Sequence, residues 1–204
     1  STSEVYGSAK YVPIDEKHPL SAQSPYSASK ISADQLAISY WNSFQLPIKI
    51  IRPFNIYGPR QSSRAVIPSI IIQALNSKNE IKLGNVEPTR DFTYVTDTCN
   101  AFLDILKIKN FFGNTLNLGS NNEYTIEYIC KKILTKLNSE ANIKKEERRI
   151  RPLKSEVTRL VCDNTKILKQ TNWKPKIDIE EGLDITISWF KENKDFFKHD
   201  IYHV

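Results

Sequence analysis

The residues with the clearest capacity for chemistry are Tyr26 and Lys30, which stand four positions apart directly after Ser24 and Pro25. A tyrosine with an ordinary pKa of about 10 is a weak base at neutral pH, but a lysine ammonium one helical turn away favours the phenolate. Residues four apart share one face of a helix. If this segment is helical, the pair could therefore accept a proton from a hydroxyl group.

The flanking residues predict such a helix. Ser24 suits the N-cap and Pro25 the first helical position, and a helical pattern continues to about Gln45. We therefore expect Tyr26 and Lys30 in the first turns of a rigid helix, beside a loop.

Spacing alone does not identify the site. The Tyr-x-x-x-Lys pattern also occurs at Tyr6/Lys10 and at Tyr128/Lys132, the latter inside an ordinary amphipathic stretch. Only Tyr26 follows a Ser-Pro cap, precedes a long helical pattern and has a cluster of Ser, Thr and Glu upstream. Because a motif needs its structural setting, we assign the chemistry to Tyr26.

The upstream cluster consists of Thr2, Ser3 and Glu4. Together with the downstream pair it supplies hydroxyls, a carboxylate, a phenol and an ammonium. These are the groups that proton transfer during sugar oxidation and reduction requires.

Four ordered blocks extend this pattern along the chain: STSEVYG at 1–7, SPYSASK at 24–30, RPFNIYGPR at 52–60 and TRDFTYVTDT at 89–98. Together they resemble the extended short-chain dehydrogenase/reductase superfamily, in particular its NAD-dependent nucleotide-sugar epimerase/dehydratase family. The resemblance covers essentially the whole chain. It implies a Rossmann fold, NAD as cofactor and a nucleotide-diphosphate sugar as substrate.

The resemblance also implies catalytic roles. Tyr26 would take the proton from the sugar 4-hydroxyl while NAD accepts the C4 hydride, with Lys30 holding the phenolate and a cofactor ribose and Thr2 bonding the hydroxyl. A 4-keto group acidifies the C5 hydrogen, so a carboxylate over C5 can start an elimination at C6, and Glu4 is the candidate base. Epimerases of the family usually lack an acid here, so Glu4 favours a lyase.

Ser3 departs from one subgroup. Many deoxythymidine-diphosphate-glucose 4,6-dehydratases have Asp there, as the acid for the departing C6 hydroxyl, whereas guanosine-diphosphate-mannose dehydratases and uridine-diphosphate-glucuronate decarboxylases commonly show Thr-Ser-Glu. Segments 58–61, 65–68 and 83–92 look more like dehydratases of activated N-acetylglucosamine of the legionaminic-acid type. We therefore predict a 4,6-dehydratase, with a decarboxylase as runner-up and a 4-epimerase or a non-catalytic binding or oligomerisation module as further alternatives.

The resemblance implies seven substrate-binding residues, which are Asn55, Arg60, Val66, Leu83, Arg90, Arg151 and Glu156. Arg90 and Arg151, with Asn55, match positions that contact the diphosphate, since arginine can donate two parallel hydrogen bonds to it. Glu156 matches a ribose partner.

The remaining members contact other parts of the ligands. Val66 and Leu83 would bracket the base, and Phe54 would approach the nicotinamide of the cofactor. Neighbouring subfamilies differ at Arg60 and at Arg159.

The residue pattern elsewhere predicts alternating helices and strands, and thus an α/β fold with parallel pairing. Helices are expected at 25–45, 66–75, 95–107, 125–137 and 179–192, strands at 48–52, 81–83 and 115–118, and a loop at 55–60. In the helix at 95–107 the apolar residues recur at helical spacing and are expected to face the core; they are Val95, Cys99, Phe102, Leu103 and Leu106.

By the resemblance these elements form two domains. Residues 1–60 and 91–120 would be the C-terminal part of a NAD-binding Rossmann domain, a doubly wound parallel sheet. Residues 61–90 and 121–204 would form a smaller α/β domain that binds the nucleotide sugar.

Composition narrows the class of protein. The 204 residues are 40% hydrophobic and 25% charged, enough to bury a core, and they contain no apolar run near the roughly 18 residues of a membrane span. The net charge is +6, but the densest tract, 144–151, mixes signs and is expected to be a solvated face rather than a nucleic-acid site. Cys99, Cys130 and Cys162 lack metal-ligand spacing, so we expect a cytoplasmic protein without a metal site.

The chain contains no Met and only six Gly, none of them in a G-x-G-x-x-G or G-x-x-G-x-x-G arrangement. By the resemblance, the dinucleotide phosphates bind a Gly-rich half that precedes the catalytic loop. We therefore expect a preceding half of the same polypeptide as a required partner and no activity from these 204 residues alone. We also expect a homodimer to which the Tyr26 helix contributes.

Overall fold

The computed structural model describes residues 1–77, 79–150, 152 and 155–197. Its helices are η1 (Ser3–Tyr6), α1 (Pro25–Phe44), α2 (Val66–Asn76), α3 (Val95–Lys107), α4 (Ile126–Lys136), η2 (Glu147–Arg149), α5 (Thr165–Gln170), α6 (Ile179–Glu192) and η4 (Lys194–Phe196). Its strands are β1 (Ile50–Pro53), β2 (Asn55–Tyr57), β3 (Glu80–Leu83), β4 (Thr89–Arg90), β5 (Phe92–Tyr94), β6 (Thr115–Leu118), β7 (Tyr124–Thr125), β8 (Asn142–Lys145) and β9 (Arg159–Leu160). The five predicted helices and three predicted strands are confirmed, with small shifts at their ends.

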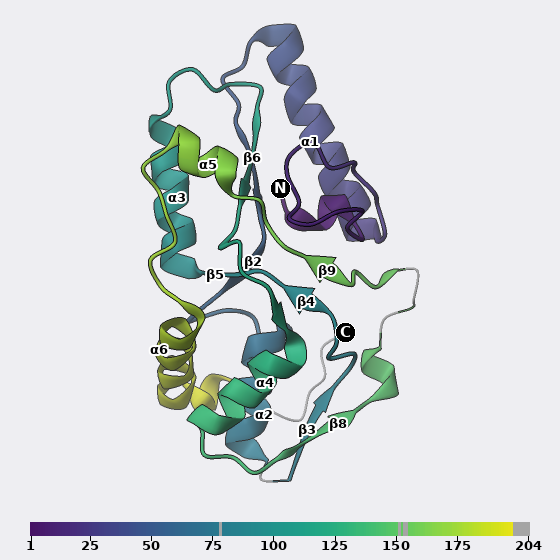
Figure 1. Cartoon of the computed structure of the whole chain (residues 1–204), viewed down its shortest axis with the longest axis vertical. Coiled ribbons are helices and arrows are strands. Elements are labelled where there is room, and N and C mark those ends of the chain that lie inside the picture. Colours follow the sequence, from purple (N-terminus) through teal and green to yellow (C-terminus); the bar gives the residue numbers. More distant parts are fainter. Residues whose placement is uncertain (78, 151, 153–154, 198–204) are drawn as a thin grey trace.

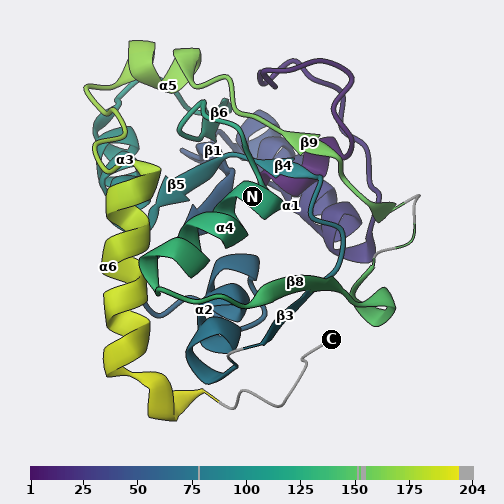
Figure 2. The same ribbon diagram turned by 60° about the horizontal axis from the view of Figure 1, so that its bottom comes forward.

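Parallel pairing dominates the described strands, as an α/β fold requires. β1 pairs with β6, β2 with β5 and β3 with β8, all parallel. β4 pairs parallel with β9 and antiparallel with β7. Figure 1 shows α1 on one side of β6 and α3 with α5 on the other. Figure 2 brings forward the end that lies at the bottom of Figure 1, where α2, α4 and α6 gather.

The predicted loop at 55–60 is wrong in its first half, because Asn55–Tyr57 forms β2. Its partner β5 begins at Phe92, far along the chain, and Asn55 lies opposite that residue. Because the partner strand is so distant in the sequence, the residues around 55–57 alone do not predict the pairing. The consequence is that the Asn55 backbone is fixed, with its N–H donating to the Asp91 carbonyl at 3.0 Å.

The start of α1 follows the predicted cap. The Ser24 side chain accepts a hydrogen bond from the Ser27 N–H at 3.0 Å, and Pro25 occupies the first turn. Gln45 ends the helix in the left-handed conformation, with φ 55°. Along α1 only Ser27 and Asp34 are fully buried, so polar contacts attach this helix to the rest of the chain.

The predicted core face of α3 is wrong. Cys99, Phe102, Leu103 and Leu106 are exposed, and Val95 is half-buried. The buried residues of α3 are instead Asp97, Thr98, Ala101 and Ile105.

A polar anchor explains this rotation of α3. The Asp97 carboxylate accepts hydrogen bonds from the N–H groups of Lys176 and Ile177 at 2.8 and 2.9 Å. The Asp97 carbonyl accepts a further bond from the Trp173 ring nitrogen at 2.8 Å. Because hydrophobic periodicity counts an aspartate as solvent-facing, it could not find this face.

The observed α3 face leads to a test of stability. Ile105 is 1% exposed, so Ile105→Ala is expected to lower the free energy of unfolding by about 2–5 kcal/mol, the cost of a cavity. Leu106 is 73% exposed, so Leu106→Ala should change it by only about 0.5 kcal/mol. Urea unfolding of the 204-residue chain, followed by circular dichroism, measures both. A larger effect at Leu106 would contradict the observed face.

The buried apolar residues form three clusters. The largest joins α2, α4 and α6 with β3 and β5, and it contains Leu183, Ile187 and Phe190 from one face of α6. A second cluster lies around Val5 and Tyr6, and a third joins α3 to β1 and β6.

Residues 157–173 were assigned from the sequence to the nucleotide-sugar-binding domain. Val157, Leu160 and Cys162 pack in the cluster around Val5, and Ile167 and Trp173 pack against α3 and β6. The domain boundaries stay a prediction. Among the described residues no helix has the length and apolar content to cross a lipid bilayer.

Candidate active site

The segment that carries the predicted acid–base residues is a single 3-10 turn fastened to α1. Thr2 is its N-cap, and the Thr2 hydroxyl accepts a hydrogen bond from the Glu4 N–H at 3.3 Å. The Ser27 hydroxyl, next to Tyr26 on α1, donates to the Glu4 carbonyl at 2.7 Å. The turn that carries Glu4 is therefore hydrogen-bonded, through the Ser27 side chain, to the helix that carries Tyr26.

Tyr26 and Lys30 lie on the accessible side of the first turns of α1. The Tyr26 side chain is 53% exposed, and the Lys30 ammonium lies 5.7 Å from the centroid of its ring. Among the described residues no carboxylate pairs with Lys30. The phenol and its cation are thus open to a ligand.

The rival pair differs in its surroundings rather than in its geometry. The Lys132 ammonium lies 5.4 Å from the Tyr128 ring, close to the distance found at Tyr26. Lys132, however, forms an ion pair with Glu180 at 2.7 Å, and the Tyr128 hydroxyl donates to the same carboxylate. The third instance places Tyr6 fully inside the core.

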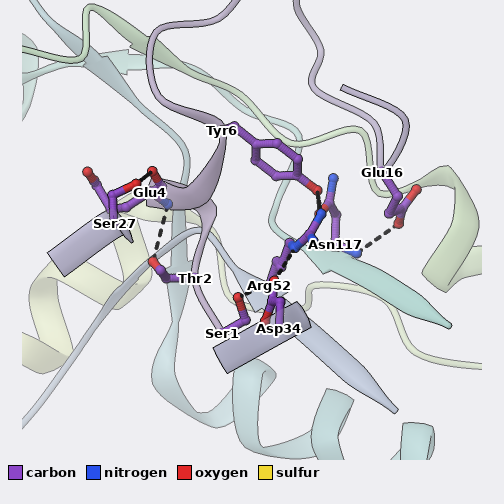
Figure 3. A network of polar contacts seen from close by, with 9 residues as sticks. All are labelled: Ser1, Thr2, Glu4, Tyr6, Glu16, Ser27, Asp34, Arg52 and Asn117. Atoms are coloured by element: carbon purple, nitrogen blue, oxygen red, sulfur yellow. Dashed lines mark hydrogen bonds and ion pairs between the residues drawn. The ribbon is translucent and has the colours of Figure 1, made fainter. Parts of the chain in front are cut away.

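Behind α1 lies a buried polar network, drawn in Figure 3. The Arg52 Nε donates to Asp34 Oδ2 at 2.9 Å, and its Nη1 donates to the Tyr6 hydroxyl at 3.0 Å. The Tyr6 hydroxyl in turn donates to Asn117 Oδ1 at 2.6 Å. Burial raises the pKa of Tyr6 to about 12, so this phenol stays neutral and cannot replace Tyr26 as a base.

A cavity of about 340 Å³ brings together residues that were predicted for different tasks. Six predicted residues line it, which are Glu4, Asn55, Val66, Leu83, Arg90 and Glu156. Val66 begins α2 and Leu83 ends β3, and further apolar lining comes from Ile56 of β2, Phe92 of β5 and Ile126 of α4. The same cavity is therefore lined by the candidate catalytic base (Glu4), the candidate diphosphate donors (Asn55 and Arg90) and the candidate contacts of the nucleobase (Val66 and Leu83).

Two buried acceptors in the cavity lining have no hydrogen-bond partner within the part of the chain that the structure describes. They are Asn55 Oδ1 and Gln61 Oε1. A buried polar atom without a partner costs about 1–3 kcal/mol, which a ligand donor would recover. Each of these two oxygens could accept a hydrogen bond from a ligand hydroxyl or amide group.

Arg90 and Glu156, predicted to hold a diphosphate and a ribose, form an ion pair in the cavity lining. Arg90 Nη2 lies 3.7 Å from Glu156 Oε1, and Arg90 Nη1 donates to the Thr89 carbonyl at 2.8 Å. The cation is thus positioned before a ligand binds. No group of three or more His, Cys, Asp or Glu able to hold a metal ion occurs among the described residues.

Four predicted residues near the turn lie outside the cavity lining. They are Thr2, Ser3, Tyr26 and Lys30. Ser3 is 3% exposed, and Thr2 is half-buried. Of the predicted catalytic residues, Glu4 alone lines this cavity.

Two further predicted residues, Phe54 and Arg60, do not line the cavity. Phe54 is 3% exposed and packs with its ring centroid 6.4 Å from that of Tyr6. Arg60 is exposed on a backbone with φ 65° and does not line the cavity. Arg151 lies outside the described residues.

Five polar residues of the lining were missed from the sequence, which are Gln61, Arg64, Ser69, Asn85 and Arg149. Arg149 belongs to the tract 144–151, predicted to be a solvated face, and that prediction is wrong at this residue. The turn of η2 aims it inward, where the Arg149 carbonyl lies so close to Gly84 that a Cβ there would stand 2.3 Å away. The glycine in Leu83-Gly84-Asn85 was the available signal.

The chain is similar to known proteins along almost its whole length. The family model for GDP-mannose 4,6 dehydratase matches residues 1–186. The chain is 33% identical over 196 residues to dTDP-D-glucose 4,6-dehydratase of Homo sapiens, covering 95% of this chain and 55% of that protein.

Two solved structures are similar throughout. One is dTDP-glucose 4,6-dehydratase from Bacillus anthracis in complex with NAD, with a TM-score of 0.85 at 33% identity, covering 97% of this chain and 62% of that one. The other is TunA, an NAD-dependent NDP-hexosamine 5,6-dehydratase involved in tunicamycin biosynthesis, with a TM-score of 0.83 at 30% identity, covering 94% and 61%.

Parallel sheets covered by helices, with a Tyr–Lys helix start beside a carboxylate-lined cavity, define the class as a short-chain dehydrogenase/reductase of Rossmann type. The chain belongs to the GDP-mannose 4,6-dehydratase-like family of NAD-dependent nucleotide-sugar dehydratases and epimerases. It spans about 55% of the length of its human relative.

Proposed function

We propose that this chain is the catalytic and substrate-binding portion of a NAD-dependent nucleotide-sugar 4,6-dehydratase. The observation that carries the proposal is the position of Glu4. Glu4 lines the cavity, and its carbonyl accepts a hydrogen bond from Ser27, the neighbour of Tyr26. A base for C5 and a base for the 4-hydroxyl therefore converge on one region.

In this mechanism Tyr26 accepts the proton of the sugar 4-hydroxyl, and the nearby Lys30 ammonium stabilises the phenolate. The Thr2 hydroxyl can still donate to the sugar oxygen, because in its cap contact it acts as acceptor. Glu4 removes the C5 proton that the 4-keto group acidifies, the C6 hydroxyl departs, and a proton returns to C5. The sugar loses one water overall. The part of Ser3 in the departure of the hydroxyl stays a prediction.

NAD, when bound, supplies the acceptor for the C4 hydride and the donor of a hydride to C6. The B. anthracis relative is in complex with NAD. In this chain the exposed Tyr26 phenol and the Lys30 ammonium fit such a cofactor, since an ammonium can donate to ribose hydroxyls. The approach of Phe54 to the nicotinamide remains a prediction from the resemblance.

The nucleotide sugar would occupy the cavity. Arg90 and Asn55 would donate to the diphosphate, Val66 and Leu83 would bracket the base, and Glu156 would accept from the ribose. Arg149 extends the cationic lining, so we add it to the proposed diphosphate contacts. Arg60 and Arg151 stay predictions from the resemblance.

Incubation of the full-length parent with activated N-acetylglucosamine and other nucleotide hexoses, followed by mass spectrometry, tests the reaction. We expect a 4-keto-6-deoxy product that has lost one water. Carbon dioxide from a glucuronate substrate without dehydration of hexoses would establish the decarboxylase, and inversion at C4 without a mass change the epimerase. No turnover of any nucleotide sugar would favour a binding or oligomerisation module.

We further propose that the phosphates of NAD bind a preceding segment of the same polypeptide, and that the enzyme is a homodimer. Supporting the dimer, α1 exposes Leu36, Tyr40 and Phe44, which are 60%, 46% and 73% accessible. The free thiols of Cys99, Cys130 and Cys162 suit the reducing cytoplasm. Analytical ultracentrifugation of the parent would decide the dimer.

A further inference from the structure

The buried pair Asp34 and Arg52 has no part in the reaction derived above, yet it lies directly behind the residues that do. Asp34 follows Lys30 by four residues and Tyr26 by eight, so the three share one stripe of α1. Asp34 and Arg52 are 3% and 4% exposed. Because burying two charges costs several kcal/mol per ion and an apolar pair often serves stability as well, stability alone does not account for them.

The attachment of α1 depends on polar contacts of this kind. No apolar side chain of α1 is fully buried, although Ile31 packs half-buried against the cluster around Val5. The two fully buried side chains, Ser27 and Asp34, both reach the segment that carries Glu4. Ser27 donates to the Glu4 carbonyl at 2.7 Å, and Asp34 Oδ2 accepts from the Ser1 hydroxyl at 2.9 Å.

Arg52 connects this attachment to the sheet. It lies on β1, and its fork donates in two directions, from Nε to Asp34 and from Nη1 to the Tyr6 hydroxyl. Tyr6 ends η1, the turn that contains Glu4, and it bonds Asn117 on β6. Figure 3 shows these side chains converging between α1 and the two strands. A lysine could not make both bonds, because its ammonium lacks the planar fork.

Resting on the proposed dehydratase function, we propose that Asp34 and Arg52 are positioning residues, which fix α1 on β1 and thereby set the Tyr26 phenol and the Glu4 carboxylate to act on one sugar. Oxidation at C4 and elimination across C5 and C6 use neighbouring carbons of one bound molecule. A displacement of about 1 Å at the reacting groups can cost about 10²-fold in rate. The cavity residues that hold the nucleotide are outside the network and should bind as before.

Kinetics of the full-length parent separate positioning from simple stabilisation. Asp34→Ala and Arg52→Lys are expected to lower kcat about 10- to 100-fold while KM stays within about threefold. Asp34→Asn, which keeps an oxygen acceptor for Arg52 Nε, should recover much of the loss. Asp104→Ala is the control, because it breaks a 2.8 Å ion pair with Lys107 at the surface and should leave kcat unchanged.

A folded Asp34→Ala protein with wild-type kcat would overturn the proposal. If that variant does not fold, Arg52→Lys decides, and wild-type kcat in Arg52→Lys would overturn the proposal. Hydrogen exchange gives a readout independent of turnover: amides of residues 25–44 should exchange faster in Arg52→Lys than in wild type, and unchanged exchange would overturn the anchoring of α1. If the wild-type parent converts no nucleotide sugar, the proposed function fails, and exchange still decides the anchoring.

Discussion

Tyr26→Phe is expected to lower kcat of the full-length parent by about 10² to 10⁴, the usual contribution of general acid–base catalysis. The phenol is 53% exposed at the start of α1, with the Lys30 ammonium 5.7 Å from its ring. Removing the hydroxyl removes the acceptor for the 4-hydroxyl proton and leaves the ring and the helix in place. Single-turnover measurement of reduced nicotinamide after mixing with the nucleotide sugar reports this first step.

Tyr128→Phe is the matched control for this prediction. Tyr128 has the same spacing to a lysine and a ring-to-ammonium distance of 5.4 Å. Its lysine, Lys132 of α4, is however paired with Glu180 of α6. Its kcat should equal that of wild type. A Tyr26→Phe enzyme that forms reduced cofactor at the wild-type rate would mean that another group takes the proton.

Local signals in the sequence were enough to place the helices. The Ser24 cap and the first-turn Pro25 mark the start of α1, and the apolar face of α6 lies where its periodicity puts it. Structure that depends on distant partners was not predictable in this way. β2 exists because β5 lies beside it, and the buried face of α3 is selected by hydrogen bonds from Lys176 and Ile177 to a carboxylate.

The candidate site was predictable where a motif fixes the residue. Glu4, Asn55 and Arg90 all reach the cavity from blocks quoted in the sequence. Arg149 was not found, because a mixed-charge tract does not reveal which of its side chains turns inward. The structure shows Arg149 in the cavity lining, with its Nε donating to Glu146.

Glu4→Gln is expected to separate the two chemical steps. The amide is nearly isosteric with the carboxylate but cannot accept the C5 proton, so elimination should fall by about 10² to 10⁴ while oxidation at C4 continues. The backbone bonds that hold the turn, from Glu4 N–H to Thr2 and from Ser27 to the Glu4 carbonyl, do not involve the carboxylate and should persist. The variant should therefore accumulate the 4-keto sugar nucleotide without loss of water, visible by mass spectrometry of quenched reactions.

Glu156→Gln is the control for this experiment, because it removes a second carboxylate from the same cavity. Its partner Arg90 lies 3.7 Å away and is proposed to hold the diphosphate, so this change should alter KM and leave the ratio of elimination to oxidation unchanged. If Glu4→Gln eliminates water at the wild-type rate while C4 oxidation persists, Glu4 is not the C5 base. If instead Glu156→Gln accumulates the 4-keto product, Glu156 rather than Glu4 is the C5 base.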